Sequence, residues 1–188
     1  SGHQAIDLEG LASHRGSLLG HEPGQSQPSQ RLFETGLNQV MLKLDGSRPV
    51  LIEAESSRIG SCHIPRVLWQ RMQKAPQIRI NASLDARVDF LIRDYAHLIE
   101  NPSTLDRLFD SMIQRHGHEI CENWRQLALN RDWQQLTGSL IEQHYDPAYA
   151  RTSSRRQRVD LGFIDAGNFS DPAIPGLARQ VTTLMEAS

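Results

Sequence analysis

Three short apolar runs, separated by segments with helical periodicity, constrain the fold of this chain more than any other feature of its sequence. The runs lie within residues 4–8, 50–52 and 76–80. The middle run is too short for a lone helix and fits a strand buried on both faces, as in a parallel sheet, and the third has the period of two that is typical of a strand. Apolar residues recur at helical spacing in the intervening residues 28–44 and 64–72. This alternation of strands and helices is the order of a parallel α/β unit.

The rest of the chain has a mostly helical pattern. Ser83 is a typical N-cap for the first of these helices, Asn101-Pro102 opens the next, and His116-Gly117-His118 ends it. We therefore predict an α/β fold, with three N-terminal strands in a parallel sheet and a mostly helical C-terminal half. The expected parts are an α/β core at residues 1–82, a helical part packed on it at 83–150, and a tail at 151–188 that holds a basic segment, a strand near 159–164 and a final helix near 173–185.

The composition is typical of a soluble globular protein, since 38% of the 188 residues are apolar and 22% are charged. No run approaches the roughly 18 apolar residues of a membrane span, and no signal-peptide pattern opens the chain. We therefore predict a cytoplasmic protein with no membrane partner. Cys62 and Cys121 are far apart and indicate neither a disulfide framework nor a zinc site. His116 and His118 would point in different directions on a helix, so they predict no metal site.

The charge pattern favours phosphate recognition over bulk attraction to nucleic acid. The net charge is −2, and the 20 basic residues include only two lysines, Lys43 and Lys74. Neither lysine lies in a Gly-x-x-x-x-Gly-Lys-Ser/Thr loop, so the chain contains no P-loop of its own. Arginine, which supplies the remaining cations, has a planar fork that suits phosphate oxygens.

Two acidic stretches follow the first two predicted strands. Asp7 and Glu9 come where the first strand ends, and the glycine-flanked His14-Arg15 pair and Ser17 follow them. In open α/β sheets, ligands gather outside the carboxyl ends of the strands, so this composition indicates a phosphate-handling rim. The alternative interpretation is a polar surface turn.

The second stretch has the same character. Glu53 and Glu55 leave the second strand on the same side, because alternate residues of an extended chain share a face, and Ser56 and Arg58 add a hydroxyl and a cation. In phosphate enzymes, an acid at a strand end holds Mg²⁺ or accepts a proton from a nucleophile. The alternative is one glutamate with a structural partner and one that is solvated.

The tail holds the densest basic run of the chain. Residues 145–149, Tyr-Asp-Pro-Ala-Tyr, are predicted to form a turn with two aromatic residues. Arginines on phosphates and a ring that stacks on a base would make an RNA contact. A solvated charged segment is the alternative. The candidate RNA-binding residues are Tyr149, Arg151, Arg155, Arg156 and Arg158.

The acidic stretches belong to a larger set of short motifs that span most of the chain. They are Asp7-Leu8-Glu9-Gly10-Leu11-Ala12, His14-Arg15-Gly16-Ser17, Gln27-Pro28-Ser29-Gln30, Phe33-Glu34, Glu53-x-Glu55-Ser56, Ile59-Gly60 and His144-Tyr145-Asp146-Pro147-Ala148-Tyr149. In this order and spacing, the chain resembles the C-terminal region of the tRNA 2-selenouridine synthase family. The block from Asp7 to Ser17 is the most specific of them.

This resemblance implies a P-loop-like C-terminal domain, preceded by a rhodanese-like domain with a selenium-handling cysteine. It also implies an enzyme that geranylates 2-thiouridine at the tRNA wobble position and replaces sulfur with selenium, with geranyl diphosphate and selenophosphate as co-substrates. The implied catalytic residues are Asp7, Glu53 and Glu55, and one of these acids is a candidate ligand of Mg²⁺. The residues implied to bind the co-substrate are Glu9, His14, Arg15, Ser17, Ser56 and Arg58.

The chain departs from the family pattern at its front. The rhodanese-like domain and the strand with its Gly-rich, Lys-containing loop should precede residue 1, and neither Cys62 nor Cys121 replaces the selenium-handling cysteine. We therefore expect the sheet to be a truncated P-loop-like one and this chain alone to be inactive. Two rival functions stay open. One is a P-loop kinase or ATPase, in which Glu55 positions a metal or water. The other is a noncatalytic tRNA-binding module built on the basic run.

Overall fold

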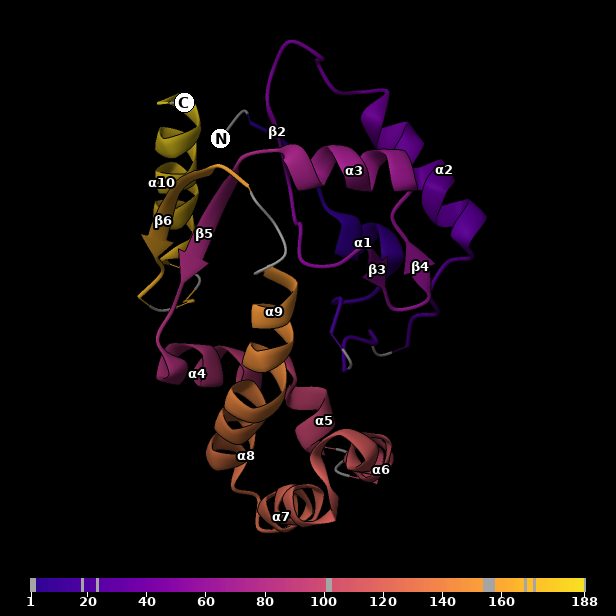
Figure 1. Cartoon of the computed structure of the whole chain (residues 1–188), viewed down its shortest axis with the longest axis vertical. Helices are drawn as coiled ribbons and strands as arrows, with labels where there is room; N and C mark the ends of the chain where they lie inside the picture. Colours follow the sequence, from indigo (N-terminus) through magenta and orange to yellow (C-terminus); the bar gives the residue numbers. More distant parts are fainter. Residues whose placement is uncertain are drawn as a thin grey trace. The chain divides into compact units, whose positions relative to one another are not determined.

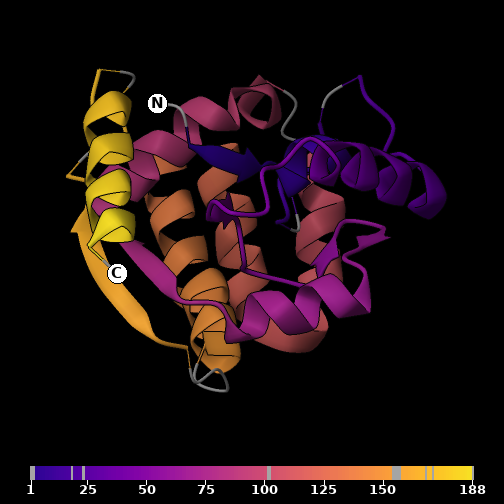
Figure 2. The same ribbon diagram turned by 90° about the horizontal axis from the view of Figure 1, so that it is seen from above.

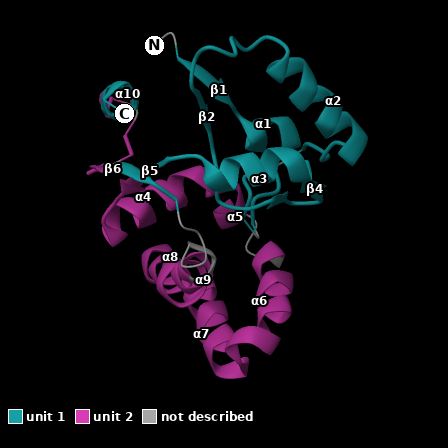
Figure 3. Cartoon of the chain, turned by 45° about the horizontal axis from the view of Figure 1, so that its top comes forward, with its two compact units in different colours: residues 1–78, 156–162, 178–188 teal, residues 79–155, 163–177 magenta. Residues whose placement is uncertain are grey.

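The computed structural model describes residues 3–17, 19–22, 24–100, 103–153, 158–167, 169–170 and 172–187, and gives only the backbone at residues 103 and 151–153. It is a mixed α/β fold with a mostly helical second half (Figure 1), which confirms the predicted fold class. No helix among these residues is long and apolar enough to cross a membrane. The chain divides into two compact units (Figure 3). Unit 1 comprises residues 1–78, 156–162 and 178–188, and unit 2 comprises residues 79–155 and 163–177.

Unit 1 is built on the predicted parallel strand pair. Strands β1 (Gln4–Ile6) and β2 (Val50–Ile52) pair in parallel, with Ile6 opposite Ile52. Between them run α1 (Leu8–Ala12) and α2 (Gln30–Met41), and Ser29 caps α2 by accepting a hydrogen bond from the Leu32 amide. A core of buried side chains holds the layers together, and its members include Ile6, Leu8, Phe33, Leu37, Ile59 and Met72.

Helix α1 corrects the expectation that the first strand extends to Leu8 and opens into a loop. The Asp7 carboxylate accepts a hydrogen bond from the Gly10 amide at 2.7 Å, so it caps a short helix instead. A side-chain acceptor at this position satisfies an N–H that has no partner within the helix. Leu8 is fully buried in the core, and it reaches the core from the first turn of a helix.

A hairpin that the apolar pattern did not indicate follows the second acidic stretch. Strands β3 (Arg58–Ile59) and β4 (Cys62–His63) pair in antiparallel fashion around Gly60, which has a φ of 58°. Helix α3 (Arg66–Lys74) comes next, with Pro65 at its N-cap position. Two residues on each side of a turn are too few to produce a detectable period.

The third predicted strand is present as β5 (Gln77–Asn81), and its partner is the late strand β6 (Asp160–Asp165). The Gln77 amide donates to the Val159 carbonyl and the Ala166 amide to the Asn81 carbonyl. The two strands run side by side, and α10 (Ile174–Glu186) lies along β6 (Figure 2). At Gly162, an added Cβ would lie 3.1 Å from Leu184, which shows how closely α10 approaches the strand.

Unit 2 is a set of packed helices. In chain order these are α4 (Leu84–Asp94), α5 (Ala96–Glu100), α6 (Ser103–His116), α7 (His118–Leu129), α8 (Trp133–Leu140), the π-helical turn η1 (Ile141–Tyr145) and α9 (Asp146–Ser153). Ser83 caps α4 through the Ala86 amide, as predicted. Trp124 is fully buried, as expected of a core tryptophan, and its indole N–H donates to Ser139 at 2.8 Å.

The predicted turn at residues 145–149 is wrong, because this segment belongs to η1 and α9. Pro147 is the second residue of α9. Helix α9 continues directly from η1, because Asp146 has helical dihedral angles (φ −59°, ψ −44°) and its amide donates to the Ile141 carbonyl. Pro147 therefore lies within a continuous helical run, directly after the π-helical turn, and both features are known causes of a bend in a helix.

Candidate functional site

The parallel register of β1 and β2 brings the two acidic stretches to one edge of unit 1. Because Ile6 lies opposite Ile52, Asp7 and Glu53 both follow directly where the strands end. The Glu53 carboxylate accepts a hydrogen bond from the Glu9 backbone amide at 3.0 Å. The two stretches that sequence reasoning paired are therefore in direct contact.

Glu9 is the electrostatic centre of this group. Burial raises its pKa to about 7, and the negative charges of Glu55, Glu53 and Asp7 add to that effect, whereas Arg15 opposes it. A half-buried carboxyl among like charges holds its proton more tightly than one in water. Asp7, Glu9, Glu53 and Glu55 thus form one electrostatically coupled set, which we call the carboxylate cluster.

Gly16 lies against the carboxylate of Glu9. A Cβ at residue 16 would come within 2.4 Å of Glu9 Oε1, and the backbone there has a φ of 68°. Only glycine meets both conditions without strain. The loop after α1 consequently folds back over the carboxylate cluster, and this contact explains the glycine in the His-Arg-Gly-Ser motif.

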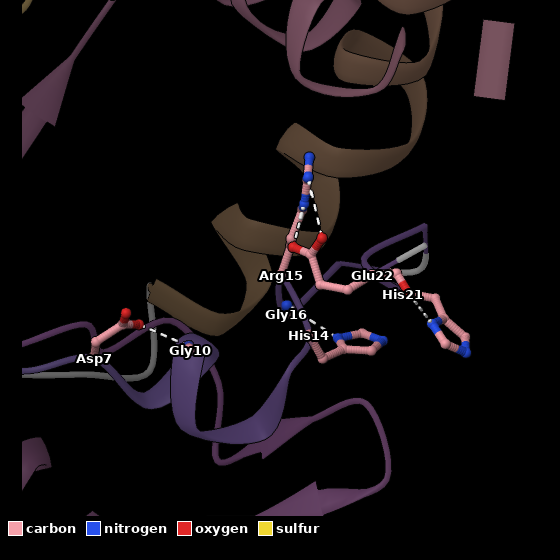
Figure 4. Close-up of polar contacts among 7 residues, drawn as sticks. All are labelled: Asp7, Gly10, His14, Arg15, Gly16, His21 and Glu22. Carbon is pink, nitrogen blue, oxygen red and sulfur yellow. Dashed lines mark hydrogen bonds and ion pairs between the residues drawn. The ribbon is translucent and has the colours of Figure 1, made fainter. Parts of the chain in front are cut away.

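The cation of this loop is held by a residue that sequence reasoning did not select. Arg15 donates from Nε to Glu22 Oε1 at 2.7 Å and from Nη2 to Glu22 Oε2 at 3.3 Å, as Figure 4 shows. The Arg15 amide donates to the Gly20 carbonyl, and the Gly20 amide donates to the Ser17 carbonyl. An anion that binds Arg15 must therefore compete with Glu22. An acid seven residues from an arginine, in a segment with no helical period, gives no pairing signal.

His14 has a local structural role. Its Nδ1 accepts a hydrogen bond from the Gly16 amide at 3.1 Å (Figure 4). Its backbone pairs with His21 in an isolated antiparallel bridge. Burial lowers the pKa of His14, and the neighbouring His21 lowers it further. A neutral imidazole is therefore favoured at this position.

On the second stretch, Ser56 and Arg58 also bond locally. The Ser56 hydroxyl accepts from the Arg58 amide, and Arg58 Nε donates to the Gly60 carbonyl at 2.7 Å. Two glutamines that were not singled out individually organise the hairpin. Gln27 bonds to the hairpin and to α1, and Gln30 bonds to both the amide and the carbonyl of His63. Their place in the Gln27-Pro28-Ser29-Gln30 motif was the available signal.

No group of three or more His, Cys, Asp or Glu side chains within the described ranges is arranged to hold a metal ion. The assignment of Mg²⁺ to an acid of the carboxylate cluster stays a prediction. On α3, Met72 is buried in the core, and Leu68 and Trp69 pack against that core.

The candidate tRNA-binding residues are only partly placed. Tyr149 lies on α9 and is 40% exposed, and Arg158 precedes β6 and is half-buried. Arg155 and Arg156, and the side chain of Arg151, lie outside the described residues. Their assignment to tRNA stays a prediction.

Comparison with known proteins identifies the family. Residues 1–107, more than half of the chain, match the model of the tRNA 2-selenouridine synthase AAA domain. The chain belongs to the tRNA 2-selenouridine synthase family. This membership confirms the resemblance seen in the sequence motifs.

Individual members of this family align over most of the chain. A tRNA 2-selenouridine synthase from Cupriavidus pinatubonensis is 45% identical over 183 residues, and one from Alcanivorax borkumensis is 34% identical over 183 residues. Each alignment covers 81% of this chain and 49% of the relative. The chain thus spans about half the length of these synthases. No solved structure matches it.

Proposed function

We propose that this chain is the part of a tRNA 2-selenouridine synthase that binds the prenyl diphosphate and the tRNA. The proposed enzyme geranylates 2-thiouridine at the wobble position and then replaces sulfur with selenium from selenophosphate. Family membership supports this reaction. The observation that carries the proposal is the contact between Glu9 and Glu53 where two parallel strands end.

In the proposed geranyl transfer, the thiouridine sulfur attacks C1 of the geranyl group. The bond between C1 and the diphosphate oxygen breaks, and its electron pair leaves with the diphosphate. The base gives up its N3 proton, so the product is a neutral S-geranyl base. Glu9 accepts this proton and later releases it to water. A carboxyl with a pKa of about 7 suits that role, because it is a stronger base than an ordinary glutamate and is still half-ionised at neutral pH.

The remaining residues position the reactants. Arg15, Ser17, Ser56 and Arg58 are the proposed donors to the diphosphate, whose leaving charge they stabilise. Glu53 holds the backbone of Glu9 and raises its proton affinity through its own charge. The proposal needs no covalent intermediate with the protein, and it assigns the later selenium step to the intact enzyme.

The test is geranyl transfer to thiolated tRNA by the intact protein. We expect Glu53→Gln to lower the rate on the order of tenfold, because Glu9 becomes a weaker base. We expect Arg15→Ala to raise the KM for geranyl diphosphate about tenfold, because a two-point phosphate contact is lost. Glu119→Gln, at an exposed position on α7, is the matched control and should behave as wild type. Unchanged kinetics in both test variants would overturn the assignment.

The matched family model favours a second candidate function, because it describes an AAA domain. We propose phosphoryl transfer from a nucleotide as this alternative, with Glu55 positioning a metal or the attacking water. The alternative predicts ATP hydrolysis by the intact protein that Glu55→Gln abolishes. Geranyl transfer without nucleotide turnover would reject it.

A further inference from the structure

Gln27 makes four hydrogen bonds to three residues, which lie in two separate segments of unit 1. Its Nε2 donates to the carbonyls of Ala12 at 3.2 Å and Ile59 at 3.1 Å. Its Oε1 accepts from the backbone amide of Ser61 at 2.8 Å and from the Ser61 hydroxyl at 3.1 Å. Both donor hydrogens and both acceptor lone pairs of the amide are therefore used.

The two segments are α1, which carries part of the carboxylate cluster, and the β3–β4 hairpin, which follows the second acidic stretch. Ala12 is the last residue of α1, the helix that Asp7 caps and that contains Glu9. Ile59 ends β3, four residues after Glu55, and Ser61 lies in the turn of the β3–β4 hairpin. The Gln27 amide thus joins the helix of the first acidic stretch to the hairpin of the second.

The residues around the Gln27 side-chain amide leave room for an amide and for little else. Gly60 has a φ of 58°, and a Cβ there would lie 2.2 Å from Gln27 Oε1. Any other residue at position 60 would displace the amide. A glutamate at position 27 would not fit either, because its carboxylate would face two carbonyl oxygens with no hydrogen to donate.

We propose that Gln27 is a positioning residue of this site, whose amide fixes α1 against the β3–β4 hairpin and so sets the separation of Glu9 from Glu55. The catalytic consequence of this role rests on the proposed function. The effect on the separation of Glu9 from Glu55 can be measured without catalysis. Gln27 itself touches no reactant and acts through Glu9.

Gln30 provides a matched control. It bonds to the same hairpin, through the His63 amide and carbonyl at 2.8 Å each, and it also donates to Glu34. The two His63 contacts join α2 to β4, the Glu34 contact lies within α2, and none of them reaches α1. Gln30→Met and Gln27→Met therefore remove the same chemistry from the same hairpin, but only the second should loosen α1.

The experiment follows the titration of the Glu9 carboxyl group by carbon-detected NMR in the intact protein, together with geranyl transfer. In Gln27→Met we expect the midpoint to fall from about 7 toward its ordinary value by about half a pH unit or more, because Glu9 moves away from Glu55. Gly60→Ala keeps glutamine at position 27 but displaces its side-chain amide. This variant should shift the Glu9 midpoint in the same direction. Gln30→Met should not shift it.

Two results separate this proposal from the proposed function. A Glu9 midpoint that is the same in Gln27→Met, Gly60→Ala and Gln30→Met overturns the positioning role, whatever the activity. A midpoint that shifts only in the first two variants supports it. If those variants transfer geranyl at the wild-type rate despite the shift, the positioning role stands and the proposed catalytic use of Glu9 fails.

Discussion

At the scale of single residues, the ion pair between Arg15 and Glu22 decides whether the loop after α1 can bind an anion. Both side chains are mostly buried, with 24% and 28% of their surface exposed, and the guanidinium is held at two points. A phosphate group, like a carboxylate, offers two oxygens that a guanidinium group can bind at once. In the proposed function, Glu22 therefore competes with the diphosphate for Arg15.

This geometry predicts that Glu22→Gln strengthens binding of geranyl diphosphate. The neutral amide holds the guanidinium less tightly, so the KM for the diphosphate should fall roughly three- to tenfold. Steady-state kinetics of the intact protein measure the change, and Arg15→Ala with Glu22→Gln should abolish the gain. A KM that is unchanged or higher in Glu22→Gln would show that Arg15 is not a diphosphate ligand.

The sequence predicts the contacts of some site residues but not those of others. The proximity of Asp7, Glu9 and Glu53 follows from two buried strands that run parallel, because parallel strands end at a common edge. The contacts of Gln27 do not follow, since they join residues 15, 32 and 34 positions away with no periodic pattern. The same holds for Glu22, which lies in a loop whose path is set by the His14–His21 bridge.

At the scale of elements, η1 carries the buried His144, which pairs with the half-buried His116 at the end of α6 in unit 2. His144 Nδ1 lies 2.8 Å from His116 Nε2, and the ring of His144 packs edge-on against Tyr145. Burial lowers the pKa of His144 to about 4, with further contributions from Arg115 and His116. π-helical turns are common at functional sites, and here the turn places a neutral imidazole 7% exposed in the helical core.

This pair predicts that unit 2 loses stability in mild acid. The unfolded chain binds a proton at His144 near its ordinary pKa of 6.5, whereas the folded chain does so only near 4. The free energy of unfolding should therefore fall as the pH drops from 6.5 toward 4, by roughly 3 kcal/mol at most. Urea unfolding at about pH 7.5 and about pH 5 measures the slope.

The controls for this prediction lie in the same unit. His144→Asn should reduce the pH dependence, because the imidazole whose pKa the fold lowers is removed. His118→Gln, at an exposed position on α7, should leave it as in wild type. An equal loss of stability in the wild type and in His144→Asn would contradict the account.

Element boundaries show where local sequence signals suffice. Ser83 and Asp132 cap α4 and α8 through their side chains, as expected of N-cap residues. Helix α1 was missed because its five residues include a glycine and follow an apolar run directly. Helix α9 was missed because Asp-Pro is typical of turns, whereas here the pair follows η1 within a continuous helical run.

At the scale of the whole molecule, an alternating pattern predicts that a strand exists but not which strand it pairs with. That is why β5 was expected beside the N-terminal strands, whereas it pairs with β6. The sequence predicts the α/β order most directly, because few other folds combine short apolar strands with amphipathic helices in alternation. The carboxylate cluster of unit 1 is the functional consequence of that order.

The most direct test of the account is the pH dependence of geranyl transfer by the intact protein, compared between wild type and Glu9→Gln. We predict that the wild-type rate rises with pH through an inflection near 7, because Glu9 must be ionised to accept a proton. In Glu9→Gln, the inflection should disappear and the rate at neutral pH should fall on the order of 100-fold. An inflection near 7 that persists in Glu9→Gln, at the wild-type rate, would contradict the account.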